Sequence, residues 1–408
     1  MSLARGVRVL APFVVPLLLV VIEWPLLSPT PALADHFQFW AAGHMIVTGE
    51  SPYDRSAWEA AAAYGPIPDG IAMNTVIRNL AQTQALWLYP PQTAFLFAPF
   101  GALPLALGVP LLHAFVMLTV AAAVVLAARA VRLSGPSLAL GLTVAALSQP
   151  FVINVRNGQL TGVVLAGAVL ASTGIRDRRP LMLGIGVALV SLKPHIAIAF
   201  GLGVLGYLLV KRDWRSLATA TIALLVATIP AELRDPFPLG QLTASGDDRL
   251  ALDLSTVGAV ARDLGDGAAA AAVIASIAIA TAVAAVWWTD PRMRRAVAVG
   301  ALLSLSLVVA PYAHDYDELL IVPTLFAAMS VARGSRVELA ISGLAAAAVA
   351  IVPWVLFYWW PLLGEGDRRF QGGPLGILPV LAVLMLGLAS WSVRRASSAP
   401  GRVIGSND

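Results

Sequence analysis

The chemistry that this sequence could support starts from a few ionisable residues set among apolar runs. Asp35 and His36 directly follow the first long apolar run, in ADHFQFW. Lys193 lies in SLKPH, within an apolar stretch, and His314 lies in PYAHDYDELL. An ionisable residue at membrane depth is costly and is therefore a candidate for function. Asp35 could serve as a base and Lys193 as a cation for an anionic ligand such as a phosphate. The alternative for Lys193 is a side chain that extends to the membrane interface.

Two polar clusters lie at the ends of apolar runs. The segment FVINVRNGQLTG forms a very short loop between two of them, and there Arg156 could bind a phosphate together with Gln159. The loop could also be only a turn. In HDYDE, a solvated acidic turn is the alternative for Asp317 and Glu318, whereas His314 is expected to face a site, because histidine can pair with a carboxylate or a phosphate. The spacing does not support a metal site.

The position of Asp35 depends on whether the preceding run stays in the mature protein. Ala32-Leu33-Ala34 matches the small-residue pattern at which a signal peptide is cleaved. The apolar core before it is long and interrupted by Pro12, Pro16 and Glu23, and many apolar runs follow. We therefore expect the segment to remain as a membrane span, which places Asp35 at its outer mouth.

The elements that must position these residues are membrane helices. Of the 408 residues, 58% are hydrophobic and 12% are charged, and the mean hydropathy is +0.80. A helix of roughly 20 apolar residues crosses a bilayer, and such runs recur near residues 7–27, 105–128, 137–153, 160–174, 217–230, 268–288, 296–311, 319–331, 337–359 and 374–393. The absence of cysteine excludes disulfides and thiolate chemistry.

Basic residues alternate between the connecting loops, as the positive-inside rule requires. They gather on the loops that we place in the cytoplasm, around residues 5–8, 129–132, 176–179, 211–215, 292–295, 333–336 and 394–395. This topology accounts for the net charge of +4 without a nucleic-acid partner. The run 181–210 has basic flanks at both ends, so we predict two half-helices that form a re-entrant-like hairpin, broken at Pro194 with its tip pointing outward.

The predicted fold is an all-α polytopic membrane protein, a single domain over residues 1–408 with about twelve membrane segments. Residues 28–90 form a long first extracytoplasmic loop, residues 231–267 a second one, and residues 394–408 a cytoplasmic tail. Helical spacing within the first loop predicts interfacial helices over His36–Val47, Ser56–Tyr64 and Asn74–Leu88. We expect residues 90–104 to form a re-entrant or interfacial piece.

Five segments occur in order between Asp35 and Pro323: DHFQFWAAGHMIVTGESPYD, LYPPQTAFLFAPFGALP, NGQLTG, SLKPH and APYAHDYDELLIVP. In this combination they resemble the family 87 glycosyltransferases, membrane enzymes of the GT-C class that use polyprenyl-phosphate sugars. The resemblance implies a GT-C-type fold, with Asp35 as the catalytic base and His314 as its partner or as a partner of the donor phosphate. Lys193 matches the lysine of the KP motif. An aromatic or aliphatic residue commonly follows the aspartate in the family, whereas His36 follows it here.

The predicted activity is therefore an inverting glycosyl transfer, with mannose as the first candidate sugar. The partners would be a polyprenyl-phosphate-sugar donor, a glycolipid or glycan acceptor and the lipid bilayer. Lys193, Arg156 and Gln159 are expected to bind the donor phosphate, and further candidates for substrate contact are His36, Tyr89, Asn157, Asp315 and Asp317. Such chemistry needs a base and cations and no cofactor. The site would face outward from the cytoplasmic membrane.

Two other functions are compatible with a polytopic membrane protein of this composition. A transporter or lipid flippase would have broken helices with charges near the bilayer midplane, whereas the charges here cluster at the outer ends of spans. A non-catalytic membrane assembly protein would tolerate replacement of Asp35.

Overall fold

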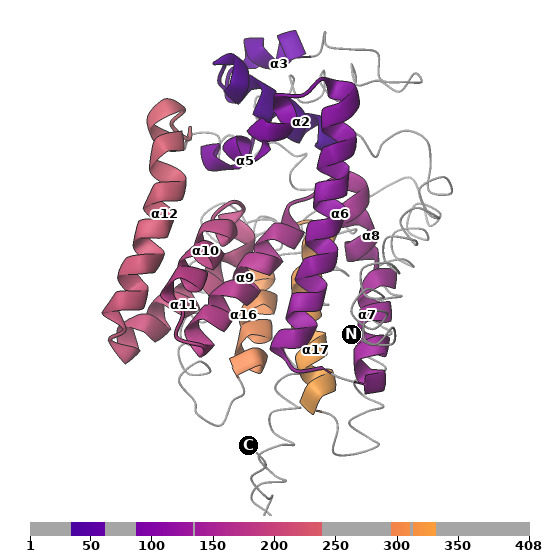
Figure 1. Ribbon diagram of the computed structural model, residues 1–408, viewed down its shortest axis with the longest axis vertical. Helices are drawn as coiled ribbons and strands as arrows, with labels where there is room; N and C mark the ends of the chain where they lie inside the picture. The colour runs from indigo at the N-terminus through magenta and orange to yellow at the C-terminus, as the bar shows by residue number, and fades with distance from the viewer. Residues whose placement is uncertain (1–33, 62–86, 134, 239–294, 311–312, 332–408) are drawn as a thin grey trace, which may run out of the picture.

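The computed structural model of the chain describes residues 34–61, 87–133, 135–238, 295–310 and 313–331, and these residues form helices and no strands (Figure 1). The all-α prediction is confirmed for this part of the chain. The predicted spans 7–27, 268–288, 337–359 and 374–393 lie outside the described residues, as do nearly all of the second loop and the whole C-terminal tail. The helices are α2 (Ala34–Thr48), α3 (Arg55–Ala61), α5 (Pro91–Gly101), α6 (Leu105–Ala130), α7 (Gly135–Leu147), α8 (Gln149–Asn157), α9 (Thr161–Arg176), α10 (Pro180–Val190), η3 (Pro194–Ala197), α11 (Ile198–Lys211), α12 (Trp214–Arg234), α16 (Arg295–Val309), η4 (Asp315–Ile321) and α17 (Val322–Val331).

Several of these helices have the length and composition of membrane spans. Within the described residues, Leu105–Ala130, Pro194–Lys211 and Trp214–Arg234 are each long and apolar enough to cross a bilayer. A fourth candidate is the pair α7 and α8, which is bent by 51° at its break. The sequence predicts one continuous span over residues 137–153, and the bend lies at Ser148, two residues before Pro150. The length and the apolar composition of these helices are those of a membrane protein.

Helices α6 and α9 run in the same direction, and α10 runs in the opposite direction. Val120 of α6 lies against Gly162 at the start of α9, and Val131, just after α6, lines one cavity with Arg176 at the end of α9. These two helices therefore run parallel. A three-residue turn joins α9 to α10, so α10 runs back along α9. The close backbone contact between Gly186 of α10 and α9 leaves no room for a side chain, since a Cβ atom there would lie 2.4 Å from a backbone nitrogen.

A basic residue follows the C-terminal end of three helices. Arg132, Arg178 and Arg212 follow α6, α9 and α11, with φ angles of 57°, 53° and 52°. Cations are favoured there because the last carbonyl groups leave a partial negative charge. The ends of α6 and α11 point away from α2, α3 and α5, which lie together at the top of Figure 1. These three arginines thus lie at one end of this part of the molecule, as predicted for the loops around residues 129–132, 176–179 and 211–215.

The predicted break near Pro194 is present. Helix α10 ends at Val190, the 3₁₀ helix η3 begins at Pro194, and α11 continues from it. Residues 191–193 form the connection, which we call the hairpin tip. Two side chains of α5 bind the backbone of the tip: Gln92 donates to the Ser191 carbonyl at 3.1 Å and Thr93 donates to the Leu192 carbonyl at 2.9 Å. The start of α5 therefore fixes the tip in place.

Helix α2 differs from the amphipathic surface helix that the spacing predicts. Its aromatic and aliphatic residues are buried on almost all sides, including Phe39, Trp40 and Met45 at 0–1% exposure. It packs closely on α5, where Gly43 lies against the carbonyl of Phe97 and Gly101 lies against the backbone of α2. An apolar face was the right prediction, but neighbours that are distant in sequence cover the other faces too.

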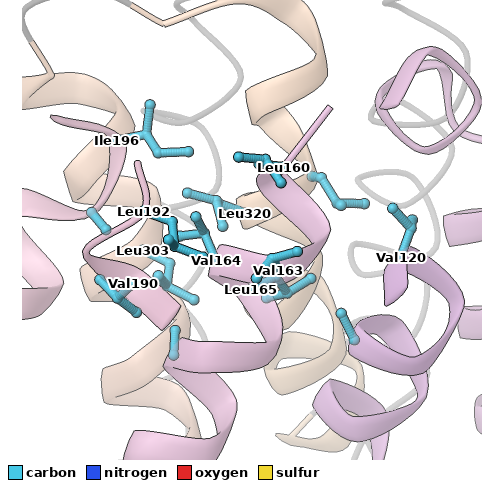
Figure 2. Packing of buried hydrophobic residues seen from close by; sticks show 14 of the residues in the cluster. Val120, Leu160, Val163, Val164, Leu165, Val190, Leu192, Ile196, Leu303 and Leu320 are labelled. Carbon is cyan, nitrogen blue, oxygen red and sulfur yellow. The ribbon is translucent and has the colours of Figure 1, made fainter. Parts of the chain in front are cut away.

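A hydrophobic core joins the elements that carry the polar residues (Figure 2). Leu160 precedes α9, Leu192 lies in the hairpin tip, Ile196 in η3 and Leu320 in η4, and all four are at most 6% exposed. Each lies within four residues of a polar candidate. Packing of these apolar side chains therefore determines where Gln159, Lys193 and the acids of η4 lie.

Candidate active site

The turn between α8 and α9 places Gln159 with little freedom. The N–H of Gln159 donates to the Asn154 carbonyl at 2.9 Å and that of Gly158 donates to the Val155 carbonyl at 3.3 Å, which together make a Schellman motif. Gly158 has a φ of 77°, a conformation that glycine adopts without strain. The sequence predicts a polar loop here, but the structure continues α8 to Asn157, so Asn154 and Arg156 belong to a helix.

Asp35 and Gln159 are brought together across 124 positions of sequence. The Gln159 side-chain amide donates to Asp35 Oδ2 at 2.9 Å, and its oxygen accepts from the Tyr89 hydroxyl at 3.2 Å. The backbone carbonyl of Tyr89 in turn accepts from the Tyr53 hydroxyl at 2.7 Å. Gln159 is buried, whereas Asp35 is partly exposed. These contacts form a chain of hydrogen bonds that ends on the Asp35 carboxylate.

His36 faces away from Asp35 into the protein. Its side chain has 0% exposure, and its Nε2 lies 3.0 Å from Nδ1 of His113 on α6, so one ring donates a hydrogen bond to the other. The same ring packs on Gly158, where a Cβ atom would lie 2.7 Å from it. His36 therefore joins the start of α2 to α6 and to the turn that carries Gln159.

Lys193 and Asp317 form a buried ion pair. Lys193 Nζ lies 2.6 Å from Asp317 Oδ1, with the two side chains 2% and 0% exposed, and 4.6 Å from the centre of the Tyr316 ring. Thr161 also donates to Asp317 Oδ1 at 2.6 Å, and the N–H of His314 donates to Oδ2 at 3.1 Å. These contacts exclude both alternatives, a lysine that extends to the interface and a solvated acidic turn. Glu318 is likewise buried.

The electrostatics of Asp35 connect the two groups of residues. Burial raises the pKa of the Asp35 carboxyl above its ordinary value. The Gln159 hydrogen bond and the positive charges of His314 and Lys193 oppose that effect. Both cations are thus close enough to act on the carboxylate. The structure therefore brings Asp35, Gln159, Tyr89, Lys193 and His314 into one region.

Other predicted residues lie at the edge of this region. Arg156 and Asn157 are half-buried on the last turn of α8, and Arg156 makes no hydrogen bond or ion pair with another described residue. The backbone of Asp315 begins η4, while its side chain lies outside the described atoms. No group of three or more His, Asp or Glu side chains within the described ranges is arranged to hold a metal ion.

Three residues with defined contacts were absent from the candidates that the sequence indicates: Thr161 and Tyr316 contact the ion pair, and His113 pairs with His36. Asn154, which belongs to the polar segment FVINVRNGQLTG, donates to the Tyr316 carbonyl. His113 is a lone histidine in an apolar helix, a signal that could have been followed. Thr161 and Tyr316 carry no comparable signal, because their roles depend on elements that meet only in the fold.

The comparison with known families bears directly on this region. The model of glycosyltransferase family 87 matches residues 87–311. The chain belongs to glycosyltransferase family 87. This match covers more than half of the glycosyltransferase. The matched region contains Tyr89, Gln159, Lys193 and the whole hairpin tip. No curated protein matches the chain. Family membership makes the protein a glycosyltransferase and sets aside the transporter and assembly-protein alternatives.

Proposed function

We propose that this glycosyltransferase moves a sugar from a polyprenyl-phosphate-sugar donor to a hydroxyl group of a glycolipid or glycan acceptor, with inversion at the anomeric carbon. Mannose is the sugar we propose first. One observation carries the proposal: a partly exposed carboxylate, Asp35, has one oxygen held by Gln159 and lies within electrostatic reach of Lys193 and His314.

This arrangement suits a single displacement. The acceptor oxygen attacks the anomeric carbon from the face opposite the phosphate, and the bond between that carbon and the phosphate oxygen breaks. Asp35 accepts the proton of the acceptor hydroxyl, and polyprenyl phosphate leaves as an anion. Positive charge near the departing phosphate lowers the barrier. Because Lys193 already pairs with Asp317, we assign it a contribution to the local potential, and Arg156 is the candidate for direct contact with the phosphate.

The location of the reaction is part of the proposal. The site lies at the end of α9 opposite to Arg176 and Arg178, which belong to the basic loops that the positive-inside rule assigns to the cytoplasm. A lipid-linked donor would reach such a site from within the bilayer. We therefore propose catalysis at the extracytoplasmic face of the cell membrane.

The test is transfer by purified protein in lipid nanodiscs. Polyprenyl-phosphate mannose, arabinose and glucose, each radiolabelled, are supplied in parallel with membrane glycolipid acceptors, and the anomeric configuration of the product is determined by NMR. We expect transfer from one donor with inversion and loss of transfer in Asp35→Asn. Full transfer by Asp35→Asn would refute the assigned base, and failure with every donor would refute the proposed donor class.

A further inference from the structure

We infer that Gln159 is a positioning residue for Asp35, and that Tyr89 positions Gln159 in turn. The inference rests on the proposed function for its catalytic meaning, because it names how the base of that reaction is held. It differs from the expectation that Gln159 binds the donor phosphate. The geometry points to a chain of three side chains in which the amide of Gln159 presents its N–H group to one oxygen of the Asp35 carboxylate.

The backbone of Gln159 is fixed by the two helices on either side of it, so the position from which its side chain extends is fixed too. Gln159 lies between the Schellman turn that ends α8 and the first residue of α9. The adjacent Leu160 is fully buried in the core shown in Figure 2. A side chain that starts from so constrained a backbone can hold its partner in one place.

The orientation of the amide is set by Tyr89. A glutamine amide has a donor end and an acceptor end, and the Tyr89 hydroxyl occupies the acceptor end at 3.2 Å. The donor end is then directed at Asp35 Oδ2. Tyr89 is itself held, since its carbonyl accepts from Tyr53 and its ring packs 5.1 Å from the ring centres of both Phe39 and Trp87.

The consequence for Asp35 follows from the two oxygens of its carboxylate. With Oδ2 occupied by the amide, Oδ1 is the oxygen that can face an acceptor hydroxyl. A hydrogen bond to a carboxylate also favours its ionised form, which opposes the effect of burial. Gln159 would thus keep Asp35 both oriented and able to accept a proton.

The surroundings of Asp35 define which groups a pH experiment must separate. The cations that act on it are Lys193 in the hairpin tip and His314 before η4, and Lys193 pairs with Asp317. His36 on α2 is directed at His113 on α6 instead. An experiment that follows the Asp35 carboxyl itself distinguishes its titration from that of the histidines.

The first measurement does not depend on activity. Asp35 is labelled with a water-soluble carbodiimide, which reacts with the protonated carboxyl group, and the modified peptide is quantified by mass spectrometry between pH 4 and pH 8 in wild type, Gln159→Leu and Tyr89→Phe. We expect the midpoint to rise by about one pH unit in Gln159→Leu, because a charge-assisted hydrogen bond is lost, and by less in Tyr89→Phe. An unchanged midpoint in Gln159→Leu would overturn the inference, whether or not the protein transfers sugar.

The second measurement uses the transfer assay. In Gln159→Leu we expect kcat to fall about tenfold or more, with the donor KM within about twofold of wild type and the acid limb of kcat/KM displaced to higher pH. Gln159→Glu places a second carboxylate beside Asp35 and should displace the limb at least as far. A raised donor KM with unchanged kcat and limb would show instead that Gln159 binds the donor. An inactive wild type would count against the proposed function alone.

Gln92→Leu is the matched control. Gln92 is a buried glutamine whose amide also donates a hydrogen bond, but to the Ser191 carbonyl of the hairpin tip. The same substitution removes the same kind of group from a neighbouring element without touching Asp35. Gln92 can act on Asp35 only through the position of Lys193 in the tip, so we expect the carbodiimide midpoint of Asp35 to move clearly less in this variant than in Gln159→Leu. A rise equal to that of Gln159→Leu would contradict a direct effect of Gln159.

Discussion

Asp35 and Asp317 are two carboxylates in one region of the molecule, and their surroundings give them opposite properties. Asp35 is partly exposed and, within the part of the chain that the structure describes, accepts a side-chain hydrogen bond from Gln159. Asp317 is fully buried and accepts hydrogen bonds from Lys193, Thr161 and the backbone of His314. The first has capacity left for a substrate, whereas protein groups already use the second. Residue type alone does not separate a base from a structural acid; the donors around each carboxylate do.

Their pKa values are expected to move in opposite directions. Burial raises the pKa of Asp35 and outweighs the opposing effects of the Gln159 hydrogen bond and the nearby cations. Burial alone would also raise the pKa of Asp317, but the charges of Lys193 and His314, together with the hydrogen bonds from Lys193 and Thr161, lower it below its ordinary value. A raised pKa suits a group that must take up a proton, and a lowered one suits a permanent anion.

The largest expected effect is the loss of sugar transfer when the Asp35 carboxylate is removed. Asp35→Asn should reduce the rate of sugar transfer by a factor of about 10² to 10⁴, because a general base is lost while the shape of the site is kept. Initial rates with the preferred donor measure this. Asp54→Asn, in the same first loop and exposed, is the control and should transfer at close to the wild-type rate. Equal losses in the two variants would indicate a general defect instead.

The second prediction concerns the stability that depends on the ion pair of Asp317 with Lys193. Lys193→Met leaves the buried Asp317 without its cation and should destabilise the protein by about 3–5 kcal/mol. The double variant Lys193→Met with Asp317→Leu removes both charges and should regain much of that loss. Thermal unfolding in one detergent, followed for wild type, both single variants and the double variant, measures the coupling. Additive losses would show that the two residues do not act as a pair.

A smaller effect is expected at the glycine beneath His36. Gly158→Ala forces an L-residue into a positive φ and places its Cβ against the His36 ring, which should cost about 1–2 kcal/mol for the backbone alone. We also expect lower transfer activity, because the His36 ring must shift and Asp35 is its neighbour. Gly201→Ala on α11 is the control, since a Cβ there meets nothing within 4 Å. A Gly158→Ala protein as stable as Gly201→Ala would contradict this packing.

The smallest effect is a difference in pH dependence. A carboxyl whose pKa is raised in the folded state favours folding in its protonated form, so its contribution is present at low pH and is lost as pH rises through the folded pKa. Asp35→Asn should therefore unfold at a slightly higher temperature than wild type at neutral pH, and the gap should close on acidification. Asp317, with a lowered pKa, contributes stability above its unfolded pKa that is lost as pH falls. Melting temperatures of wild type and Asp35→Asn, measured from pH 4 to pH 8, test the prediction for Asp35. A difference in melting temperature that widens in acid would contradict a raised pKa of Asp35.

Local signals in the sequence determined much of this protein. Apolar runs with basic flanks placed α6, α9, α12 and the broken pair around Pro194, because helix length and proline stereochemistry act over a few residues. Ordered motifs also indicated the family before any geometry was known. Asp35, Gln159, Lys193 and His314 were recognisable as candidates because polar residues are costly among apolar ones.

The tertiary structure decided what these candidates do. Gln159 contacts Asp35 from 124 positions away, and Lys193 finds Asp317 at the same separation; no spacing rule reaches so far. Burial of α2 on nearly all sides and the conversion of a predicted loop into the end of α8 also depend on neighbours from distant segments. The sequence by itself determined which side chains are candidates for chemistry, whereas packing determined which groups surround each carboxylate, since a pKa and a hydrogen-bond partner are properties of the assembled surroundings.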